Sequence, residues 1–266
     1  MKMAKKPQIN FLVFWVGTKC SLKCKLCCNL IPYVKQQSYD TKQIIKDLEF
    51  VSKNSTIKNL QIQGGEPFTH PQIASIIDSI AKLDINRIYI ATNGTIDLSK
   101  EVLDALKRNP NVHIRISNYE CAEILRKRFC KKLDENNISY KMYEFVHGNG
   151  TWFSTGGINE KRATDSEVKL IYEKCEDKGC ITLANGIMTV CGKIPSIKEI
   201  YNSYDKTANN EINVRHINSF IPYLKNLTLK RKIVKFYANY NNYKEQCRYC
   251  RIAEGEYPAA EQIIDK

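Results

Sequence analysis

The chain lacks any apolar segment long enough to cross a membrane, because no run reaches the roughly 18 consecutive apolar residues of a spanning helix. Histidine is scarce, with four residues in 266, and their positions form no spacing typical of a metal site. Acidic residues are also few, 28 against 41 basic ones, which gives a net charge of +13. These deficits exclude a membrane-spanning helix and a histidine-based metal site, and they favour anionic partners.

The basic charge is spread along the chain rather than gathered in blocks. Its densest basic and aromatic stretch runs from Lys225 to Lys244, where Leu229, Ile233 and Phe236 follow helical spacing. This pattern indicates an amphipathic helix with a solvated basic face, and it disfavours a nucleic-acid groove. A general enrichment in Lys, Asn and Ile explains the charge equally well.

Cysteine is abundant, with eleven residues, an odd number that includes two Cys-x2-Cys pairs. This usage fits metal sites better than a disulfide framework. The N-terminus has lysines followed by an apolar run, but that run is short and no small-residue cleavage site follows it. We therefore expect a cytoplasmic protein.

Three cysteines, Cys20, Cys24 and Cys27, follow a short apolar run over residues 10–16 that predicts a buried parallel strand. Their spacing allows three thiolates to hold one corner of a 4Fe–4S cluster. The fourth iron then stays open for a substrate or cofactor. Because reactive groups gather at the carboxyl ends of parallel strands, the sequence predicts radical or redox chemistry at this loop.

Strands and helices alternate from residue 10 to about residue 145, which predicts a parallel sheet with outer helices. The expected strands are residues 10–16, 57–63, 87–92, 112–117 and 139–146. The expected helices are Thr41–Lys53, Pro71–Lys82, Ser99–Arg108 and Cys121–Asn136.

Three of these strands end in distinctive residues. The second is followed by Gly64, Gly65, Glu66 and Pro67, where two glycines let backbone approach a ligand and a carboxylate can partner an ammonium group. The third ends in Thr92, Asn93 and Gly94, and the fourth ends at Ser117.

Together these motifs resemble the radical SAM superfamily over residues 9–145. The resemblance implies a partial (β/α)6 TIM-like barrel, with the sixth unit after Gly150. It also implies a 4Fe–4S cluster on the three cysteines and reductive cleavage of S-adenosylmethionine (SAM) to a 5′-deoxyadenosyl radical. Glu66 then partners the SAM ammonium within its Gly-Gly-Glu-Pro motif, the Thr92–Gly94 turn lies near the ribose, and Ser117 contacts the carboxylate.

A second group of cysteines lies in the last third of the chain. An Asn-Gly turn at Asn185 and Gly186 predicts a hairpin, and Cys247 and Cys250 form a chelating pair. Four thiolates suit either a structural zinc ion or a second 4Fe–4S cluster, and the residues alone leave both open.

The spacing Cys-x10-Gly-x4-Cys, followed by a distant cysteine pair, resembles the twitch subgroup, a shortened form of the SPASM domain. The resemblance implies one auxiliary 4Fe–4S cluster on Cys175, Cys191, Cys247 and Cys250. It divides the chain into a radical SAM barrel over residues 1–165 and a small C-terminal domain over residues 166–266.

Two further residues are candidates for catalysis. Cys180 can be a packed thiol, a replacement for Cys175 as a ligand, or a hydrogen-atom donor; we favour the packed thiol. Arg115 either points into the barrel, to bind an anion or act on a hydroxyl, or lies on the surface of its strand.

The resemblance to this subgroup implies oxidation or epimerisation of a carbohydrate-like or cyclitol-like small molecule, with an anionic substrate favoured by the charge. A ribosomal-peptide maturase and an iron–sulfur scaffold or sensor are the alternatives. A low-potential electron donor such as flavodoxin or ferredoxin is the expected protein partner.

Overall fold

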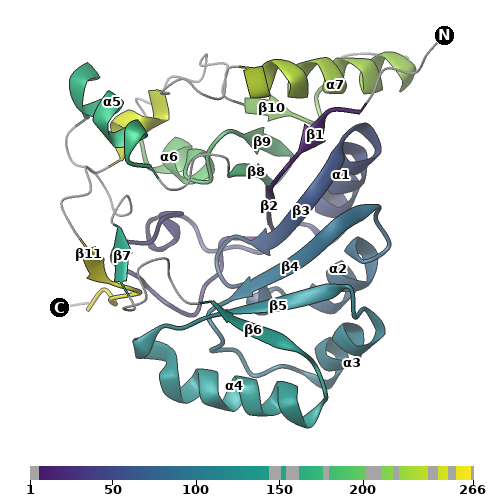
Figure 1. The fold of residues 1–266 in the computed structure, drawn as a ribbon, viewed down its shortest axis with the longest axis vertical. Helices are drawn as coiled ribbons and strands as arrows, with labels where there is room; N and C mark the ends of the chain where they lie inside the picture. Colours follow the sequence, from purple (N-terminus) through teal and green to yellow (C-terminus); the bar gives the residue numbers. More distant parts are fainter. Residues whose placement is uncertain are drawn as a thin grey trace.

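Alternating strands and helices build one parallel sheet over the first half of the chain (Figure 1). In this computed structural model each strand pairs in parallel with the next: β2 (Leu12–Trp15), β3 (Thr56–Gln63), β4 (Ile85–Thr92), β5 (Val112–Ser117) and β6 (Tyr140–Tyr143). The intervening helices are α1 (Thr41–Asn54), α2 (Ile73–Ile80), α3 (Lys100–Arg108) and α4 (Glu123–Glu135). The predicted α/β class is confirmed.

The structure describes residues 6–143, 151–153, 162–175, 180–201, 211–217, 222–238, 245–250 and 256–264. Short 3-10 turns, η1 (Ile31–Tyr33), η2 (Pro67–Thr69), η3 (Glu120–Ala122) and η4 (Glu245–Tyr249), complete the loops.

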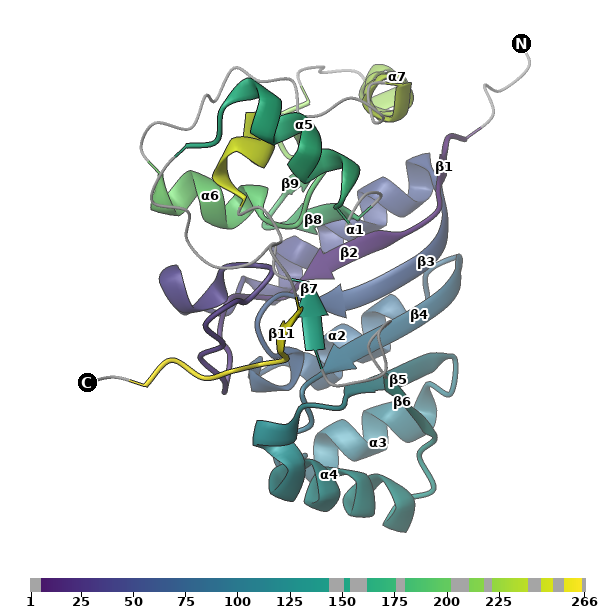
Figure 2. The same cartoon turned by 60° about the vertical axis from the view of Figure 1, so that its left-hand side comes forward.

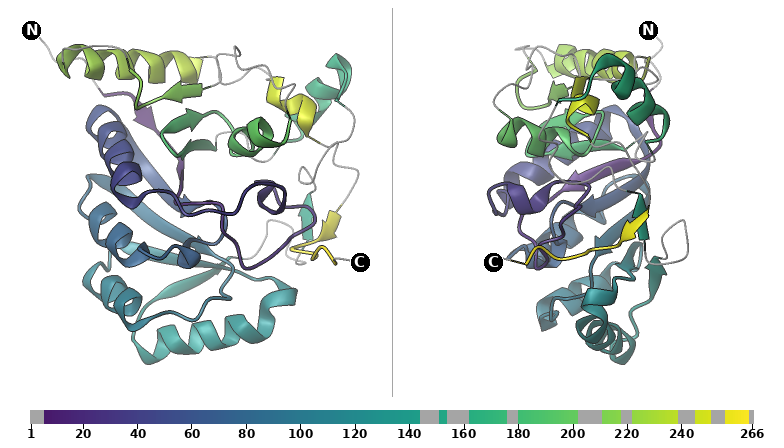
Figure 3. Two further views of the ribbon diagram at one scale, coloured as in Figure 1. Left: turned by 180° about the vertical axis from the view of Figure 1, so that it is seen from behind. Right: turned by 90° about the vertical axis from the view of Figure 1, so that its left-hand side faces the viewer.

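The two faces of the sheet differ in chemistry. Helices α1, α2 and α3 cover one face of the sheet (Figures 1 and 3). On β3, Leu60 and Ile62 are buried in the hydrophobic core, whereas Gln61 and Gln63 line a cavity, so the two pairs lie on opposite faces. Successive side chains of a strand alternate between faces, so the polar face is left free to line a cavity. The helix starts agree with the sequence, since Asp40 and Ser99 cap α1 and α3 by accepting hydrogen bonds from Gln43 and Val102.

The C-terminal third extends the same sheet beyond β2. The hairpin of β8 (Ile181–Ala184) and β9 (Ile187–Thr189) is confirmed at Asn185 and Gly186, both with positive φ. β8 lies parallel to β2, and β10 (Glu211–Asn213) lies antiparallel to β9. The short β1 (Gln8–Ile9) lies beside β3.

The sixth parallel strand follows Gly150, as expected, but it pairs with β2. Trp152 lies in β7 (Thr151–Phe153), which pairs with β11 (Glu256–Pro258) in a separate two-stranded sheet. β8 lies parallel to β2 on the side away from β3, with β9 and β10 beyond it (Figure 2). It covers the edge of β2, whose backbone groups would otherwise be unpaired.

The helices of the C-terminal third are α5 (Asp165–Glu173), α6 (Ile194–Ile200) and α7 (Pro222–Ala238). α7 is the predicted amphipathic helix: it contacts α1, and Leu229 and Ile233 are fully buried. The side chain of Phe236 lies outside the described residues. No helix in the described ranges is both long and apolar enough to span a bilayer.

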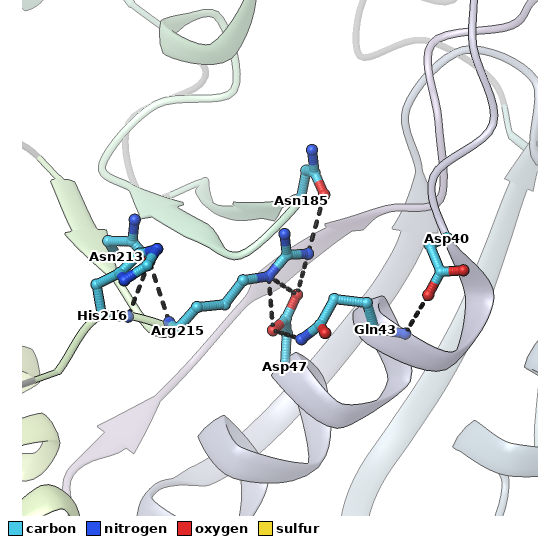
Figure 4. A network of polar contacts seen from close by, with 7 residues as sticks. All are labelled: Asp40, Gln43, Asp47, Asn185, Asn213, Arg215 and His216. Carbon is cyan, nitrogen blue, oxygen red and sulfur yellow. Dashed lines mark hydrogen bonds and ion pairs between the residues drawn. The ribbon is translucent and has the colours of Figure 1, made fainter.

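A polar network ties the hairpin to the barrel (Figure 4). The guanidinium of Arg215, just after β10, donates to the carboxylate of Asp47 on α1 at 2.7–3.1 Å and to Asn185 Oδ1 at 2.9 Å. Gln43 also donates to Asp47, at 3.1 Å. A Cβ at Gly186 would lie 2.4 Å from Nε of Arg215, so the turn lacks a side chain where the guanidinium crosses it.

We predict that Asp47→Asn lowers the free energy of unfolding by about 1–3 kcal/mol, because it leaves a half-buried guanidinium facing a neutral amide. Urea unfolding of both proteins measures this difference. Glu123→Gln is the matched control, since its ion pair with Lys127 is mostly exposed and solvent-exposed pairs add little to stability. Equal losses in the two variants would show that the Asp47 pair does not anchor the hairpin.

Candidate active site

A cavity of about 530 Å³ opens at the carboxyl ends of the parallel strands. The predicted residues that line it are Cys20, Cys24, Cys27, Gly64, Gly65, Glu66, Thr92, Asn93, Arg115, Ser117, Cys180 and Cys191. Pro67 and Gly94 lie next to lining residues, and the cavity wall does not include Cys175, Cys247 or Cys250. The described structure thus brings the N-terminal cysteines and the three strand-end motifs to one place.

The three N-terminal thiols face this cavity from a loop that follows β2. Burial raises the pKa of Cys20 and of Cys24 to about 12, and it raises the pKa of Cys27 as well. Backbone N–H groups oppose this effect at Cys20 and Cys27 by hydrogen bonding to their sulfurs. Thiolates are the form that binds metal, so loading this site must release protons.

The donor set fits a 4Fe–4S cluster. Three thiols line one cavity, and backbone amides already point at two of the sulfurs, as they do around cluster thiolates. In the part of the chain that the structure describes, no three or more His, Cys, Asp or Glu side chains converge on one point where a single metal ion could bind.

Glu66 is the acidic group of the cavity wall and is 3% exposed. Its Oε1 accepts hydrogen bonds from the Phe68 N–H at 3.1 Å and from the Thr92 hydroxyl at 2.8 Å, while its Oε2 accepts from the Asn93 N–H at 2.7 Å. Burial raises the pKa of Glu66 to about 7 against these hydrogen bonds. None of the described basic side chains forms an ion pair with this carboxylate, so it fits a cationic ligand.

The two glycines before Glu66 serve a different contact from the one expected. A Cβ at Gly64 would lie 2.1 Å from the carbonyl oxygen of Gly17, and one at Gly65 would lie 2.0 Å from that of Lys19. The Gly65 N–H donates to Gly17 O at 3.1 Å, and the Glu66 N–H donates to Lys19 O at 2.7 Å. The glycines therefore let the backbone approach the start of the cysteine loop, not only a ligand.

Asn93 connects the third strand end to the same loop. Its side chain donates to the Ser21 hydroxyl at 3.0 Å and lies 3.9 Å from the Cys20 sulfur. Ser117 bonds to Tyr119, whose pKa burial raises well above 10. Tyr119 packs edge-on against Trp152, with 5.5 Å between ring centroids, so Trp152 forms cavity wall rather than core.

Arg115 points into the barrel and lines the cavity, so the surface-strand alternative is wrong. Its Nη1 lies 3.4 Å from Gln61 Oε1, and its guanidinium lies 3.5 Å above the ring of Tyr89.

The C-terminal cysteines occupy two environments. Cys247 on η4 and Cys250 just after η4 are buried against Val168 and Ile171 of α5, close to Tyr172. Burial is the main cause of the raised pKa of Tyr172. The nearby thiols of Cys247 and Cys175 raise this pKa further. Cys191 lines the main cavity, and the buried Lys193 donates to the Cys250 sulfur at 3.4 Å.

Cys180 lies with Cys191 in the wall of the main cavity. It packs against the cluster of Val13, Trp15, Ile31 and Ala184, as Cys20 and Cys27 also do. The choice of Cys175 rather than Cys180 as the ligand beside Cys247 stays a prediction.

Sequence reasoning missed a C-terminal strap, residues 256–264, that pairs with the cysteine loop. The Lys25 N–H donates to Glu261 O and the Ile263 N–H donates to Lys23 O, both at 2.8 Å. The Gln262 side chain accepts from the Lys23 N–H at 2.9 Å and donates to the Cys24 sulfur at 3.5 Å. These contacts join residues nearly 240 positions apart, and no local sequence pattern predicts them.

Asn29 is a second residue that sequence reasoning missed. Its side chain donates to Gly64 O at 3.3 Å, and its carbonyl accepts from the Ser196 hydroxyl on α6 at 2.6 Å. It connects the cysteine loop both to the glycine motif and to the C-terminal third.

Parts of the chain are similar to a known protein family and to individual proteins of known name. The family model for the radical SAM superfamily matches residues 16–146. A 7-carboxy-7-deazaguanine synthase of Rhodopirellula baltica is 34% identical over 85 residues, 32% of this chain and 32% of that protein. A probable GTP 3′,8-cyclase of Methanocaldococcus jannaschii is 27% identical over 185 residues, 65% of this chain and 57% of that protein. The matches thus span from about a third to little over half of these relatives.

The crystal structure of BtrN in complex with AdoMet and 2-DOIA matches over nearly the full length of both chains. Its TM-score is 0.54, its sequence identity is 11%, and the match covers 97% of this chain and 98% of BtrN. At this identity the likeness shows a shared fold. The family match, the shared fold and the strand-end motifs agree, and we assign the chain, through residues 16–146, to the radical SAM superfamily.

Proposed function

We propose that this radical SAM enzyme abstracts a hydrogen atom from a carbinol carbon of a carbohydrate-like or cyclitol-like small molecule and oxidises or epimerises that carbon. An auxiliary 4Fe–4S cluster on Cys175, Cys191, Cys247 and Cys250, in a twitch-type unit over residues 166–266, belongs to the proposal. So does a cytoplasmic location, which suits a chain whose eleven cysteines, all within the described residues, form no disulfide there.

The observation that carries the SAM site is the buried carboxylate of Glu66 beside three thiols. Bound SAM and the cluster supply a 5′-deoxyadenosyl radical once an electron arrives from a low-potential donor such as flavodoxin or ferredoxin. Glu66 holds the SAM ammonium, while the hydroxyl of Thr92 and the N–H of Asn93 keep the carboxylate in place. Pro67, Gly94 and Ser117 complete the proposed SAM contacts.

The role of Cys180 distinguishes epimerisation from oxidation of the carbinol carbon. In an epimerisation, the substrate radical takes a hydrogen atom from a thiol, and the resulting thiyl radical regains one electron from the donor and one proton. In an oxidation, the substrate radical releases a proton and passes its second electron to an acceptor such as the proposed auxiliary 4Fe–4S cluster, and no thiol is needed. The position of Cys180 in the cavity wall supports the first outcome, and its packing with Ile31 supports a purely structural role.

We expect protein reconstituted anaerobically to bind about eight irons, the content of two 4Fe–4S clusters. Changing Cys20, Cys24 and Cys27 together to Ala should remove about half of this iron and abolish formation of 5′-deoxyadenosine with dithionite. Cys28→Ala is the control, because Cys28 is the neighbouring exposed thiol outside the predicted set. Zinc at the second site after purification with iron supplied would contradict the auxiliary cluster.

We expect Glu66→Gln to weaken SAM binding about 10- to 100-fold, the value of a charge-assisted hydrogen bond, with the iron content unchanged. Calorimetry measures both affinities between pH 6 and 7.5, where the SAM amino group, with a pKa near 8, stays mostly charged.

The pH dependence gives a second readout for Glu66. Because the pKa of Glu66 is raised to about 7, the ligand-free carboxyl is protonated below that pH, and wild-type affinity falls as pH decreases from 7 to 6. The Gln variant has no such proton to displace and should show a flat profile. Equal affinities, or the same pH slope in both proteins, would remove Glu66 from the SAM site.

For Cys180→Ala we expect SAM cleavage and iron content to stay at wild-type levels, because Cys175 is the proposed ligand. If Cys180 is the hydrogen donor, the variant still cleaves SAM with substrate, but the product no longer gains solvent deuterium, as mass spectrometry in deuterated buffer shows. Cys175→Ala is the matched variant and should lose about four irons. Loss of about four irons in Cys180→Ala, with the iron retained in Cys175→Ala, would make Cys180 the ligand in place of Cys175.

A further inference from the structure

The cavity face of the sheet is built in rows that the strand register fixes. Ser117 on β5 lies beside Tyr143 on β6, at the rim where SAM is proposed to bind. Two residues earlier along these strands, Arg115 lies beside Lys141 on one side and beside Ala91 of β4 on the other. Two residues correspond to about 6–7 Å along a strand, so this row lies one layer below the rim.

Two cations therefore neighbour each other on one face of the sheet: Arg115 lines the cavity, whereas Lys141 is exposed beside it and is not one of the lining residues. None of the described carboxylates forms an ion pair with Arg115 or Lys141, and the Arg115 guanidinium donates to an amide oxygen, Gln61 Oε1. Neighbouring like charges repel, and a guanidinium with five donors needs more than one acceptor. The small side chain of Ala91 leaves space beside the guanidinium.

The guanidinium is held in a fixed orientation before any ligand arrives. It stacks on the Tyr89 ring at 3.5 Å. The Gln61 amide nitrogen donates to Gln63 Oε1 at 2.7 Å, which turns the Gln61 oxygen toward Arg115. Stacking and amide orientation both reduce the entropy lost when a ligand binds.

The charges of the cavity wall leave this row uncompensated. Among the described lining residues the acidic side chain is Glu66, and the basic ones are Arg115, Lys174 and Lys193. Glu66 is committed to the ammonium of SAM in the proposed function, and Lys193 donates to Cys250. An anionic ligand group is the remaining partner for Arg115.

We propose that Arg115 and Lys141 form an oxyanion subsite below the SAM site and that the substrate carries a carboxylate or phosphate group there. The fork of Arg115 binds two oxygens of that group, Lys141 adds a point charge, and Gln61 is a positioning residue for the guanidinium. This inference rests on the proposed function, because it places the substrate in the same cavity.

The test uses the reconstituted full-length protein with SAM bound, at constant ionic strength. Inorganic phosphate is titrated in one arm and malonate in the other, and calorimetry gives the two dissociation constants; the tighter arm identifies the anion class. We expect Arg115→Gln to weaken the preferred anion at least 10-fold and Arg115→Lys to weaken it less. Arg87→Gln, an exposed arginine on β4, is the matched control and should bind like wild type.

Two results would overturn the subsite. One is equal anion binding by wild type and Arg115→Gln, including the case in which neither binds. The other is a loss of SAM affinity in Arg115→Gln with iron content preserved, which would assign Arg115 to the SAM site. Failure of the proposed function is distinguishable, because it shows as absent SAM cleavage in wild type, while the anion titrations do not require turnover.

Discussion

The active site depends on a close contact between two backbones. At Gly64 and Gly65 the loop after β3 touches the carbonyls of Gly17 and Lys19, in a space that no side chain can share. Two backbone hydrogen bonds fix this contact, and they set the Cys20 loop against Glu66. Because both loops leave neighbouring parallel strands, the sheet supplies the coarse placement and the glycines supply the last few ångströms.

The cavity separates its charges by layer. Near the rim, a buried carboxylate and three thiols face a cofactor that brings a positive charge and iron. Below the rim, stacked and neighbouring cations face outward from β5 and β6. In the proposed subsite, this separation orients a substrate by its negative end while its reacting carbon stays close to SAM. Specificity for the substrate then belongs mainly to the strand interiors, and SAM binding belongs to the strand ends.

Local patterns predicted most of the barrel. Strand and helix positions follow from periodicity, and the cysteine spacing with the three strand-end motifs located the cavity. Sequence reasoning missed contacts between distant segments: β8 pairs with β2, and Gln262 reaches Cys24 across 238 positions of the chain. The sequence pointed to Gly64 and Gly65 because a ligand could approach them. In the structure, the backbone of the cysteine loop also approaches these two glycines. The proposed boundary at residue 165 stays a prediction.

The pairing of the C-terminal strap with the cysteine loop has a consequence for biosynthesis. The loop leaves the ribosome early, but Gln262 and its neighbours emerge more than 200 residues later. Until then the Cys24 side of the loop has no strap across it, and contacts between segments so distant in sequence form slowly. Residues 256–264 can therefore pair with the cysteine loop only after more than 200 further residues have been synthesised.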